Sequence, residues 1–582
     1  MESFHVKVSF KLLASLIIAV ASFASAAAVG PVRAPHGAVA SGHELASQAG
    51  VAIMQQGGNA VDAAVATGFA LAVVLPEAGN IGGGGFMLLR LADGHAHFLD
   101  FRETAPAAAT RDMYLDAKGN VVPDASIIGY RAIGVPGSVA GLVEAEKKFG
   151  KLTLAQVMAP AIRLARDGFA LSAYDARELH DPHLAGFPES RRIFQRDGHL
   201  YQRGEILKQP ELARTLERIA ADPGSFYHGA LAQELAACIQ KGGGLITTKD
   251  LAAYEVKERE PVRGSYRGYE IISAPPPSSG GIALIELLNI LEGYDLAKLG
   301  VASAESVHLQ AEAFRRAFFD RAELLGDPDF TSIPGAALID KHYAAAWRES
   351  LDPRRASPSA GLRRPVQVFD KLDRVAAVAE PTHTTHYSVV DSAGNAVAVT
   401  TTLNDEFGSR VTPAGLGFLL NDEMDDFTSK PGSPNMFGLL QGEANAIAPG
   451  KRPLSAMSPT IVLKDGRFFL ALGSRGGPRI ITAVADVLVN VIDYGMNIQQ
   501  AVDEPRFHHQ WMPDVLRVEK NGFSPAVGNR LAAMGHKIEE GYTERGEWHP
   551  QWGDVECVAI DPKTGERLGA SDGRHRGKTA GY

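Results

Sequence analysis

Two threonines on neighbouring predicted strands are the residues of this chain best placed for nucleophilic chemistry. Residues 384–390 are rich in Thr, Tyr and Val, and residues 396–403 again carry Val and Thr, so both stretches predict strands. A three-residue loop, Ser392-Ala393-Gly394, with Gly394 at positive φ, is typical of a hairpin between them. That register places Thr402 directly opposite Thr384 on the same face, with Cβ atoms about 5 Å apart.

A threonine hydroxyl needs a neighbouring base before it can attack a carbonyl group. A free α-amine has a pKa of about 7.7–8.0, so an N-terminal threonine carries its own base at neutral pH. Cleavage between His383 and Thr384 would create such a terminus. The alternative interpretation of these residues is an ordinary Thr-rich strand in a sheet.

A resemblance to a known family decides between these interpretations. The continuous run T-T-H-Y-S-V-V-D-S-A-G-N-A-V-A-V-T-T-T-L-N-D-E-F-G, residues 384–408, resembles the signature of γ-glutamyltranspeptidases, also called glutathione hydrolases. The resemblance implies an α/β (α+β) fold of the N-terminal-nucleophile hydrolase type, an αββα four-layer sandwich. It also implies autocatalytic cleavage at His383-Thr384 into a large subunit, residues 29–383, and a small catalytic subunit, residues 384–582, which form one interleaved heterodimer.

The same resemblance assigns residues to the substrate. R-E-T-A-P contains Arg102, whose guanidinium fork suits the α-carboxylate of a substrate. Asn404, Glu423 and Asp426 correspond to the α-ammonium site, where carboxylates neutralise the cation and Asn adds a neutral acceptor.

The family motif P-L-S-S-M-S-P is only partly kept here. Ser455 stands at its first serine, but Ala456 replaces the second. We expect the lost hydroxyl to weaken carboxylate binding by about 1.5–3 kcal/mol, unless water or Ser458 compensates.

Two further segments resemble parts of the family's active site. Gly476 and Gly477 precede a predicted helix whose first turn suits Pro478, and on their own they would indicate an ordinary strand-to-helix turn. Their resemblance to the family motif G-S-P-G-G implies instead that their N–H groups form an oxyanion hole. Arg475 stands where that motif has proline. Pro431 to Asn445 resembles the lid loop, with Phe437 where a tyrosine is common in the family.

Other patterns could indicate nucleotide or metal binding. The run Gly79 to Phe86 follows a predicted helix and lacks the Lys-Ser/Thr ending of a phosphate-binding loop, so it predicts close backbone packing instead. His508 and His509 point to opposite faces of a strand, with no nearby Cys/His motif, and the acids after Leu420 lack the EF-hand spacing. We therefore expect no metal and no cofactor.

Composition bounds the remaining possibilities. The chain has 582 residues, 45% hydrophobic and 21% charged, with a net charge of −9, which describes a globular protein without a nucleic-acid partner. Residues 1–28 predict a cleaved signal peptide, with Lys7 and Lys11 before a short apolar stretch and small residues at its end. The alternative is an uncleaved membrane anchor. Cys238 and Cys557 are expected to be separate thiols in a periplasmic or secreted protein.

The elements that would position these residues follow from periodicity. Helices are predicted over 42–57, over 60–75 with Asn59 as cap, over 154–165 and over 303–324. A hairpin over 86–101 delivers Arg102, and residues 467–473 predict a strand leading to Gly476. The stretch from about 135 to 350 predicts mainly helix, and residues 351–383 an exposed tail before the cleavage site.

The implied function is hydrolysis of the γ-glutamyl amide of glutathione and related compounds, or transfer of the γ-glutamyl group to amino acids or dipeptides. Two alternatives stay open at this point. One is a related acylase for glutaryl side chains of cephalosporin-type compounds. The other is a non-catalytic periplasmic binding protein of the same ancestry.

Overall fold

Two seven-stranded sheets lie face to face. They belong to a computed structural model that describes residues 30–365, 384–430, 433, 435–436, 439, 441–541 and 552–582. The order in one sheet, called here the nucleophile sheet, is β19 (Lys578–Gly581), β2 (Ala38–Ser41), β10 (Thr385–Val390), β11 (Ala396–Thr402), β3 (Gly84–Arg90), β4 (Ala96–Phe101) and β7 (Lys257–Arg259). The order in the other is β1 (Val32–Ala34), β18 (Arg567–Ser571), β17 (Glu556–Ile560), β13 (Arg467–Gly473), β12 (Thr460–Lys464), β9 (Tyr269–Ser273) and β8 (Val262–Tyr266).

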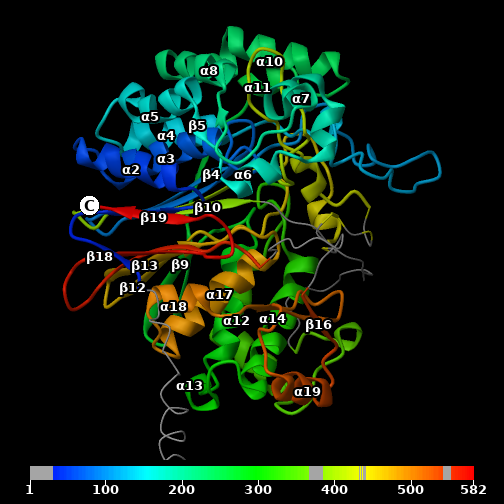
Figure 1. The fold of residues 1–582 in the computed structure, drawn as a ribbon. Helices are drawn as coiled ribbons and strands as arrows, with labels where there is room; N and C mark the ends of the chain where they lie inside the picture. Colours follow the sequence, from blue (N-terminus) through cyan, green and yellow to red (C-terminus); the bar gives the residue numbers. More distant parts are fainter. Residues whose placement is uncertain are drawn as a thin grey trace, which may run out of the picture. The chain divides into compact units, whose positions relative to one another are not determined.

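Helices cover the outer face of each sheet, giving four layers (Figure 1). Over the nucleophile sheet lie α2 (Glu44–Gln55), α3 (Ala60–Val74), α4 (Ser138–Phe149) and α5 (Leu154–Asp167), with α8 (Pro210–Ala221) and α10 (Ala230–Lys241) beyond them. On the other side lie α12 (Gly280–Leu291), α14 (Ala304–Leu324), α16 (Lys341–Glu349), α17 (Arg479–Ile492), α18 (Ile498–Asp503) and α19 (Pro525–Ala533). The predicted αββα sandwich is confirmed.

The inner faces of the two sheets share one apolar core. Phe86, Leu88 and Phe98 of the nucleophile sheet pack with Ile461 and Val558 of the other, and all five are fully or almost fully buried. Sheet-on-sheet packing of this kind requires alternating inward side chains from both sheets. The two sheets are therefore held by side-chain burial rather than by shared strands.

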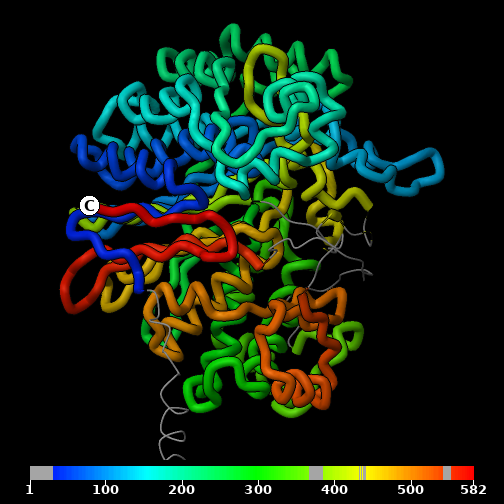
Figure 2. Tube along the Cα trace, viewed as in Figure 1, coloured from blue at the N-terminus to red at the C-terminus, as the bar shows by residue number. Residues whose placement is uncertain are grey.

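Both sheets combine strands from either side of Thr384. Near the chain ends, β1 pairs with β18 and β2 pairs with β19, so the first and last parts of the described chain lie side by side (Figure 2). In the middle of the nucleophile sheet, β10 pairs with β2, and β11 pairs with β3. The segments before and after Thr384 are thus interleaved, as predicted.

Most predicted helices are found within two residues of their expected ends. Asn59 caps α3 with a reciprocal capping box, and α5 continues through Pro160 to Asp167. Two expectations need correction. The mainly helical region also contains β7, β8 and β9, because Arg267 and Gly268 both take positive φ and turn the chain into a tight hairpin.

The segment before Thr384 is the second correction, and it is partial. Residues 351–365 are mostly exposed, as expected, but they are anchored to the body of the protein, since Ser359 and Leu362 are buried and Arg364 forms ion pairs with Asp320 and Glu323. Residues 366–383 lie outside the described part. Among the described residues, no helix is both long enough and apolar enough to cross a membrane.

Candidate active site

Thr384 lies directly before β10, across the hairpin from Thr402. The register pairs Thr385 with Thr401 and continues to Val390 opposite Ala396, so the predicted register is confirmed. Gly394 has a φ of 88°, as the three-residue loop requires. The hydroxyl oxygens of Thr384 and Thr402 are 3.3 Å apart, and both residues are buried.

The face of β10 that carries Thr384 also carries a histidine, but this histidine is not equipped to act as a base. His386 is fully buried between the sheets, and burial lowers its pKa to about 3. Its two ring nitrogens contact the hydroxyls of Thr400 and Ser388, each at 2.9 Å. His386 therefore stays neutral and engaged inside the sandwich.

A cavity opens at Thr384. Its walls come from both sides of residue 384 and from both sheets. The lining residues are Arg102, Arg321, Thr384, Thr402, Asn404, Glu423, Asp426, Leu439, Leu454, Ser455, Ala456, Met457, Gly477, Pro478 and Ile480. Nine of the ten residues that the sequence assigned to catalysis or substrate binding line it, all except Gly476.

Arg102 is surrounded by carboxyl groups. It is almost fully buried and forms ion pairs with Glu423 and Asp426, with Glu103 Oε2 3.7 Å from its Nη1. Burial raises the pKa of Glu103 to about 7, although Arg102 opposes that shift. Burial also raises the pKa of Glu423 well above its usual range, again opposed by Arg102. The cluster therefore holds protons near neutral pH.

Asn404 presents an acceptor to the cavity. It is in the left-handed region, with a φ of 82°, a conformation that Asn tolerates better than most residues. Its Nδ2 donates to the backbone oxygen of Asp422 at 3.1 Å, and its backbone N–H donates to Thr402 Oγ1 at 2.8 Å. The carbonyl Oδ1 of Asn404 makes no hydrogen bond within the described chain, so it is the atom available to a cation.

The wall at Ser455 and Ala456 is held by a segment to which the sequence assigned no role. Ser279 donates through its backbone N–H and its hydroxyl to the Ser455 carbonyl, at 2.8 and 2.5 Å. Ser278 Oγ donates to the Met457 carbonyl at 2.6 Å. Ser458 does not replace the hydroxyl missing at Ala456, because Ser458 Oγ donates to the Ala456 carbonyl at 2.9 Å.

A glycine turn follows the end of β13, and its second glycine, Gly477, lines the same cavity as Thr384. Gly476 and Gly477 have φ values of 122° and 53°, and α17 begins two residues after Gly477. In the described part of the chain, neither backbone N–H donates a hydrogen bond. Two unengaged N–H groups beside a hydroxyl nucleophile are the equipment of an oxyanion hole.

The glycine run before β3 packs under the site. A Cβ atom on Gly83 would lie 2.0 Å from the backbone oxygen of Thr402, and one on Gly84 would lie 2.4 Å from Glu103 Oε2. Only glycine permits this approach. The close packing predicted for this run is confirmed.

Comparisons with known proteins agree with this geometry. The sequence model of the family described as Gamma-glutamyltranspeptidase matches residues 46–582. The chain is 49% identical over 557 residues to a glutathione hydrolase proenzyme of Escherichia coli, covering 95% of this chain and 93% of the relative. The chain belongs to the γ-glutamyltranspeptidase family.

Solved structures of related proteins support the fold. A γ-glutamyltranspeptidase of Helicobacter pylori is 48% identical and matches with a TM-score of 0.55, covering 55% of this chain and 93% of that one. A cephalosporin acylase from Bacillus halodurans is 29% identical and matches with a TM-score of 0.80, covering 97% of this chain and 98% of that one. The predicted N-terminal-nucleophile hydrolase fold and enzyme class of this γ-glutamyltranspeptidase are confirmed.

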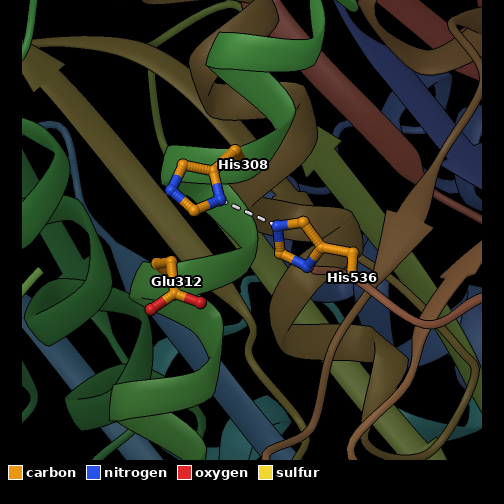
Figure 3. Close-up of side chains that lie close together, drawn as sticks. All are labelled: His308, Glu312 and His536. Carbon is orange, nitrogen blue, oxygen red and sulfur yellow. Dashed lines mark hydrogen bonds between the residues drawn. The ribbon is translucent and has the colours of Figure 1, made fainter. Parts of the chain in front are cut away.

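One cluster away from the cavity combines possible metal ligands. His308 and Glu312 of α14 lie beside His536, as Figure 3 shows. His308 Nδ1 and His536 Nε2 are 2.8 Å apart, and His308 Nε2 donates to the Asp352 carbonyl at 2.8 Å. Glu312 pairs with Arg315 and Arg316. The two histidines are therefore hydrogen-bonded to each other, and the Glu312 carboxylate is already neutralised by two arginines.

The two adjacent histidines of the sequence also have protein partners. His508 Nδ1 lies 2.9 Å from Thr482 Oγ1, and its Nε2 lies 2.8 Å from Gln510 Oε1. His509 contacts Asp514 and accepts the Trp511 N–H. In the structure Cys238 and Cys557 are separate thiols, as predicted.

Two predicted residues of this γ-glutamyltranspeptidase, His383 and Phe437, lie outside the described residues. Conversely, sequence reasoning missed Arg321, Glu103 and the Ser278-Ser279 pair. Glu103 directly follows Arg102 in the R-E-T-A-P motif, and Ser278-Ser279 lies in the rigid Pro-rich turn before α12. Both segments are recognisable in the sequence, although no role could be assigned to them. Arg321 lies inside a long helix and gave no local signal.

Proposed function

We propose that this γ-glutamyltranspeptidase matures by cutting itself between His383 and Thr384. Thr384 Oγ attacks the His383 carbonyl, the C–N bond breaks to free the Thr384 amine, and water hydrolyses the resulting ester to a His383 carboxylate. Thr402 assists, because its hydroxyl accepts the Asn404 N–H and lies within reach of Thr384 Oγ1. The products are a large subunit, residues 29–383, and a small subunit, residues 384–582.

The two subunits stay together after the cut. Strands from both contribute to each sheet, and β10 lies between β2 of the large subunit and β11 of its own. Separation would break backbone ladders in both sheets and expose the shared apolar core. The proposed mature protein is therefore a heterodimer that dissociates only on unfolding.

The mature enzyme cleaves γ-glutamyl amides such as glutathione. Arg102 and Ser455 bind the α-carboxylate, while Glu423, Asp426 and the Asn404 carbonyl oxygen bind the α-ammonium. Thr384 Oγ attacks the γ-carbonyl, its own amine takes the proton, and the N–H groups of Gly476 and Gly477 hold the oxyanion. The amine leaves with that proton, and a γ-glutamyl ester of Thr384 remains.

Water or an amine completes the cycle. Water attacks the ester to give glutamate, whereas the amine of an amino acid or dipeptide gives a new γ-glutamyl amide. No step of this cycle calls for a cofactor. We place the reaction in the periplasm or outside the cell, after removal of residues 1–28, because that stretch has the composition of a signal peptide.

The observation that carries this proposal is the 3.3 Å hydroxyl pair, Thr384 and Thr402, in a cavity that also holds Arg102, Glu423 and Asp426. A glutaryl acylase is the competing function, because the chain is 29% identical to a cephalosporin acylase. A glutaryl group has no ammonium for the carboxylates, so the cavity favours the γ-glutamyl substrate.

The decisive experiment combines mass spectrometry with a rate comparison. Purified wild-type protein should contain two chains, the smaller beginning at Thr384, while Thr384→Ala should keep the peptide bond after His383 intact. Wild-type protein should hydrolyse γ-glutamyl-p-nitroanilide faster than its glutaryl counterpart. A single intact chain in wild type would favour a binding protein, and equal or faster glutaryl turnover would favour the acylase.

A further inference from the structure

Arg321 is a second buried guanidinium in the wall of the cavity. It comes from α14, in the layer beyond the other sheet, and its residue exposure is 1%. The cavity is lined by Arg321 together with Arg102, Ser455 and Ala456. The site therefore contains two cationic side chains, and only Arg102 was identified from the sequence.

The partners of Arg321 account for only part of its donors. Nε donates to Ser279 Oγ at 2.8 Å, and Ser279 in turn holds the Ser455 carbonyl. Within the described residues, Nη1 is buried without a hydrogen-bond partner. Burial lowers the pKa of Arg321 to about 10, and the charge of Asp426 offsets only part of that effect.

The other buried arginines of α14, unlike Arg321, have a carboxylate partner. Arg315 and Arg316 both pair with Glu312, at i+3 and i+4 on the same helix. Arg102, in the same cavity, pairs with Glu423 and Asp426. Arg321 forms no ion pair with any described carboxylate. A buried cation without a counter-ion is costly, so a protein keeps one chiefly where a ligand supplies the anion.

We propose that Arg321 is a substrate-binding residue whose guanidinium donates to the α-carboxylate at the amino-acid end of the substrate. This inference rests on the proposed γ-glutamyl substrate and deepens it. Arg321 lines the same cavity as Ser455 and Ala456 and is linked to the Ser455 carbonyl through Ser279, so it belongs to the wall that lacks the second hydroxyl. The carboxylate would then bind between the guanidinium groups of Arg102 and Arg321. Arg102 also pairs with Glu423 and Asp426, so its charge is not available to the substrate alone.

A purely structural role for Arg321 predicts different behaviour. Through Ser279 it could simply hold the Ser455 wall, or through its charge it could position Asp426. The first role acts through Ser455, which also binds the α-carboxylate, so breaking the Ser279 link alone would reproduce its effect. The second role would affect only ligands with an ammonium group. Direct binding of the carboxylate affects ligands with an α-carboxylate equivalent and does not depend on Ser279. Three ligands and a Ser279 variant therefore separate the three roles.

The test measures binding by calorimetry to the processed protein, wild type and Arg321→Met. The ligands are L-glutamate, glutarate, which lacks the ammonium group, and 4-aminobutyrate, which lacks the α-carboxylate. We expect Arg321→Met to weaken L-glutamate and glutarate by about 10- to 100-fold, the cost of a lost charged hydrogen bond. We expect 4-aminobutyrate to change by less than about threefold. Equal weakening of all three ligands, loss confined to the two amines, or an equally large loss in Ser279→Ala would overturn the proposal.

Two controls keep the result interpretable. Ser279→Ala removes the Nε partner and one donor to the Ser455 carbonyl while leaving the Arg321 guanidinium in place, so it should weaken L-glutamate and glutarate clearly less than Arg321→Met does. Arg321→Lys covers the case in which the Met variant is not processed, because it keeps a cation while losing the guanidinium fork; the same preferential loss for L-glutamate and glutarate is expected. Because binding is read without turnover, a wild-type protein that fails to hydrolyse γ-glutamyl-p-nitroanilide would refute the proposed function and leave this comparison valid.

Stability gives an independent readout. Removing an unpaired buried cation should leave Tm unchanged or raise it, as often happens when a functional residue is replaced. A merely structural arginine would lower Tm when replaced by methionine. A clear fall in Tm together with uniform loss of binding would assign Arg321 to the scaffold.

Discussion

Thr402 Oγ1 lies 3.3 Å from Thr384 Oγ1 and accepts the backbone N–H of Asn404 at 2.8 Å. An accepted N–H draws electron density from the Thr402 oxygen, which makes its hydroxyl a better donor towards Thr384. The two strands thus deliver both the nucleophile and the group that stabilises negative charge on it. The hairpin register, rather than a separate catalytic loop, fixes their distance.

Replacing Thr402 should therefore impair both maturation and turnover. Thr402→Val keeps the β-branched shape and removes the hydroxyl, so we expect kcat and the rate of self-cleavage to fall by about 10- to 100-fold. Thr402→Ser should retain most activity. Cleavage is followed by gel electrophoresis, and kcat by release of p-nitroaniline.

Thr401→Val is the matched control for Thr402. Thr401 points to the other face of β11, where its hydroxyl donates to the Gly84 carbonyl at 2.8 Å. It should lower stability by about 1 kcal/mol without a comparable loss in kcat. If Thr402→Val were processed and turned over at the wild-type rate, the hydroxyl would have no part in activating Thr384.

The carboxyl cluster predicts a pH dependence of substrate binding. The pKa of Glu103 is raised to about 7, so below that pH the site carries less negative charge for an ammonium group. We expect KM for γ-glutamyl-p-nitroanilide to fall as pH rises from 6 to 8, and KM for the glutaryl analogue to rise or stay constant. Glu103→Gln should flatten both profiles. A KM for the γ-glutamyl substrate that rises over this range would contradict the assignment.

The same group has an opposite effect on folding. Because the folded pKa of Glu103 lies above its ordinary value of 4.5, the folded state binds the proton more tightly than the unfolded state. Its contribution to stability is therefore present below pH 4.5 and is lost as pH rises towards 7. In Glu103→Gln, thermal unfolding between pH 5 and pH 7 should show a smaller decrease in Tm than in the wild-type protein.

The sequence predicted the hairpin because strand side chains alternate with a period of two and a three-residue loop fixes the register. It also predicted α3, whose cap Asn59 lies directly before an apolar run. It could not single out Arg321. The run around that residue contains three buried arginines, and only contact with Ser279, far away in sequence, places the third one in the cavity.

The missing hydroxyl at Ala456 gives a prediction that couples two wall residues. If Arg321 already supplies a donor to the carboxylate, Ala456→Ser should change KM by less than about threefold in the wild-type background. In the Arg321→Met background the added hydroxyl should lower KM by about tenfold, because it replaces a donor that is now absent. Steady-state kinetics of the four proteins form a double-mutant cycle. Equal effects of Ala456→Ser in both backgrounds would mean that the two positions act independently.

Gly83 tests whether the glycine run supports the nucleophile pair. A Cβ atom there would lie 2.0 Å from the Thr402 backbone oxygen, so Gly83→Ala must shift either β11 or the turn beneath it. We expect a loss of about 1–3 kcal/mol in stability and incomplete self-cleavage, since the Thr384–Thr402 distance changes with the strand. Gly528→Ala is the matched control. It lies within α19 with no atom near its Cβ position, so it should stabilise by about 0.5–1 kcal/mol and be processed normally. Normal processing of Gly83→Ala at an unchanged Tm would show that β11 tolerates the shift and that the glycine is not needed to hold Thr402.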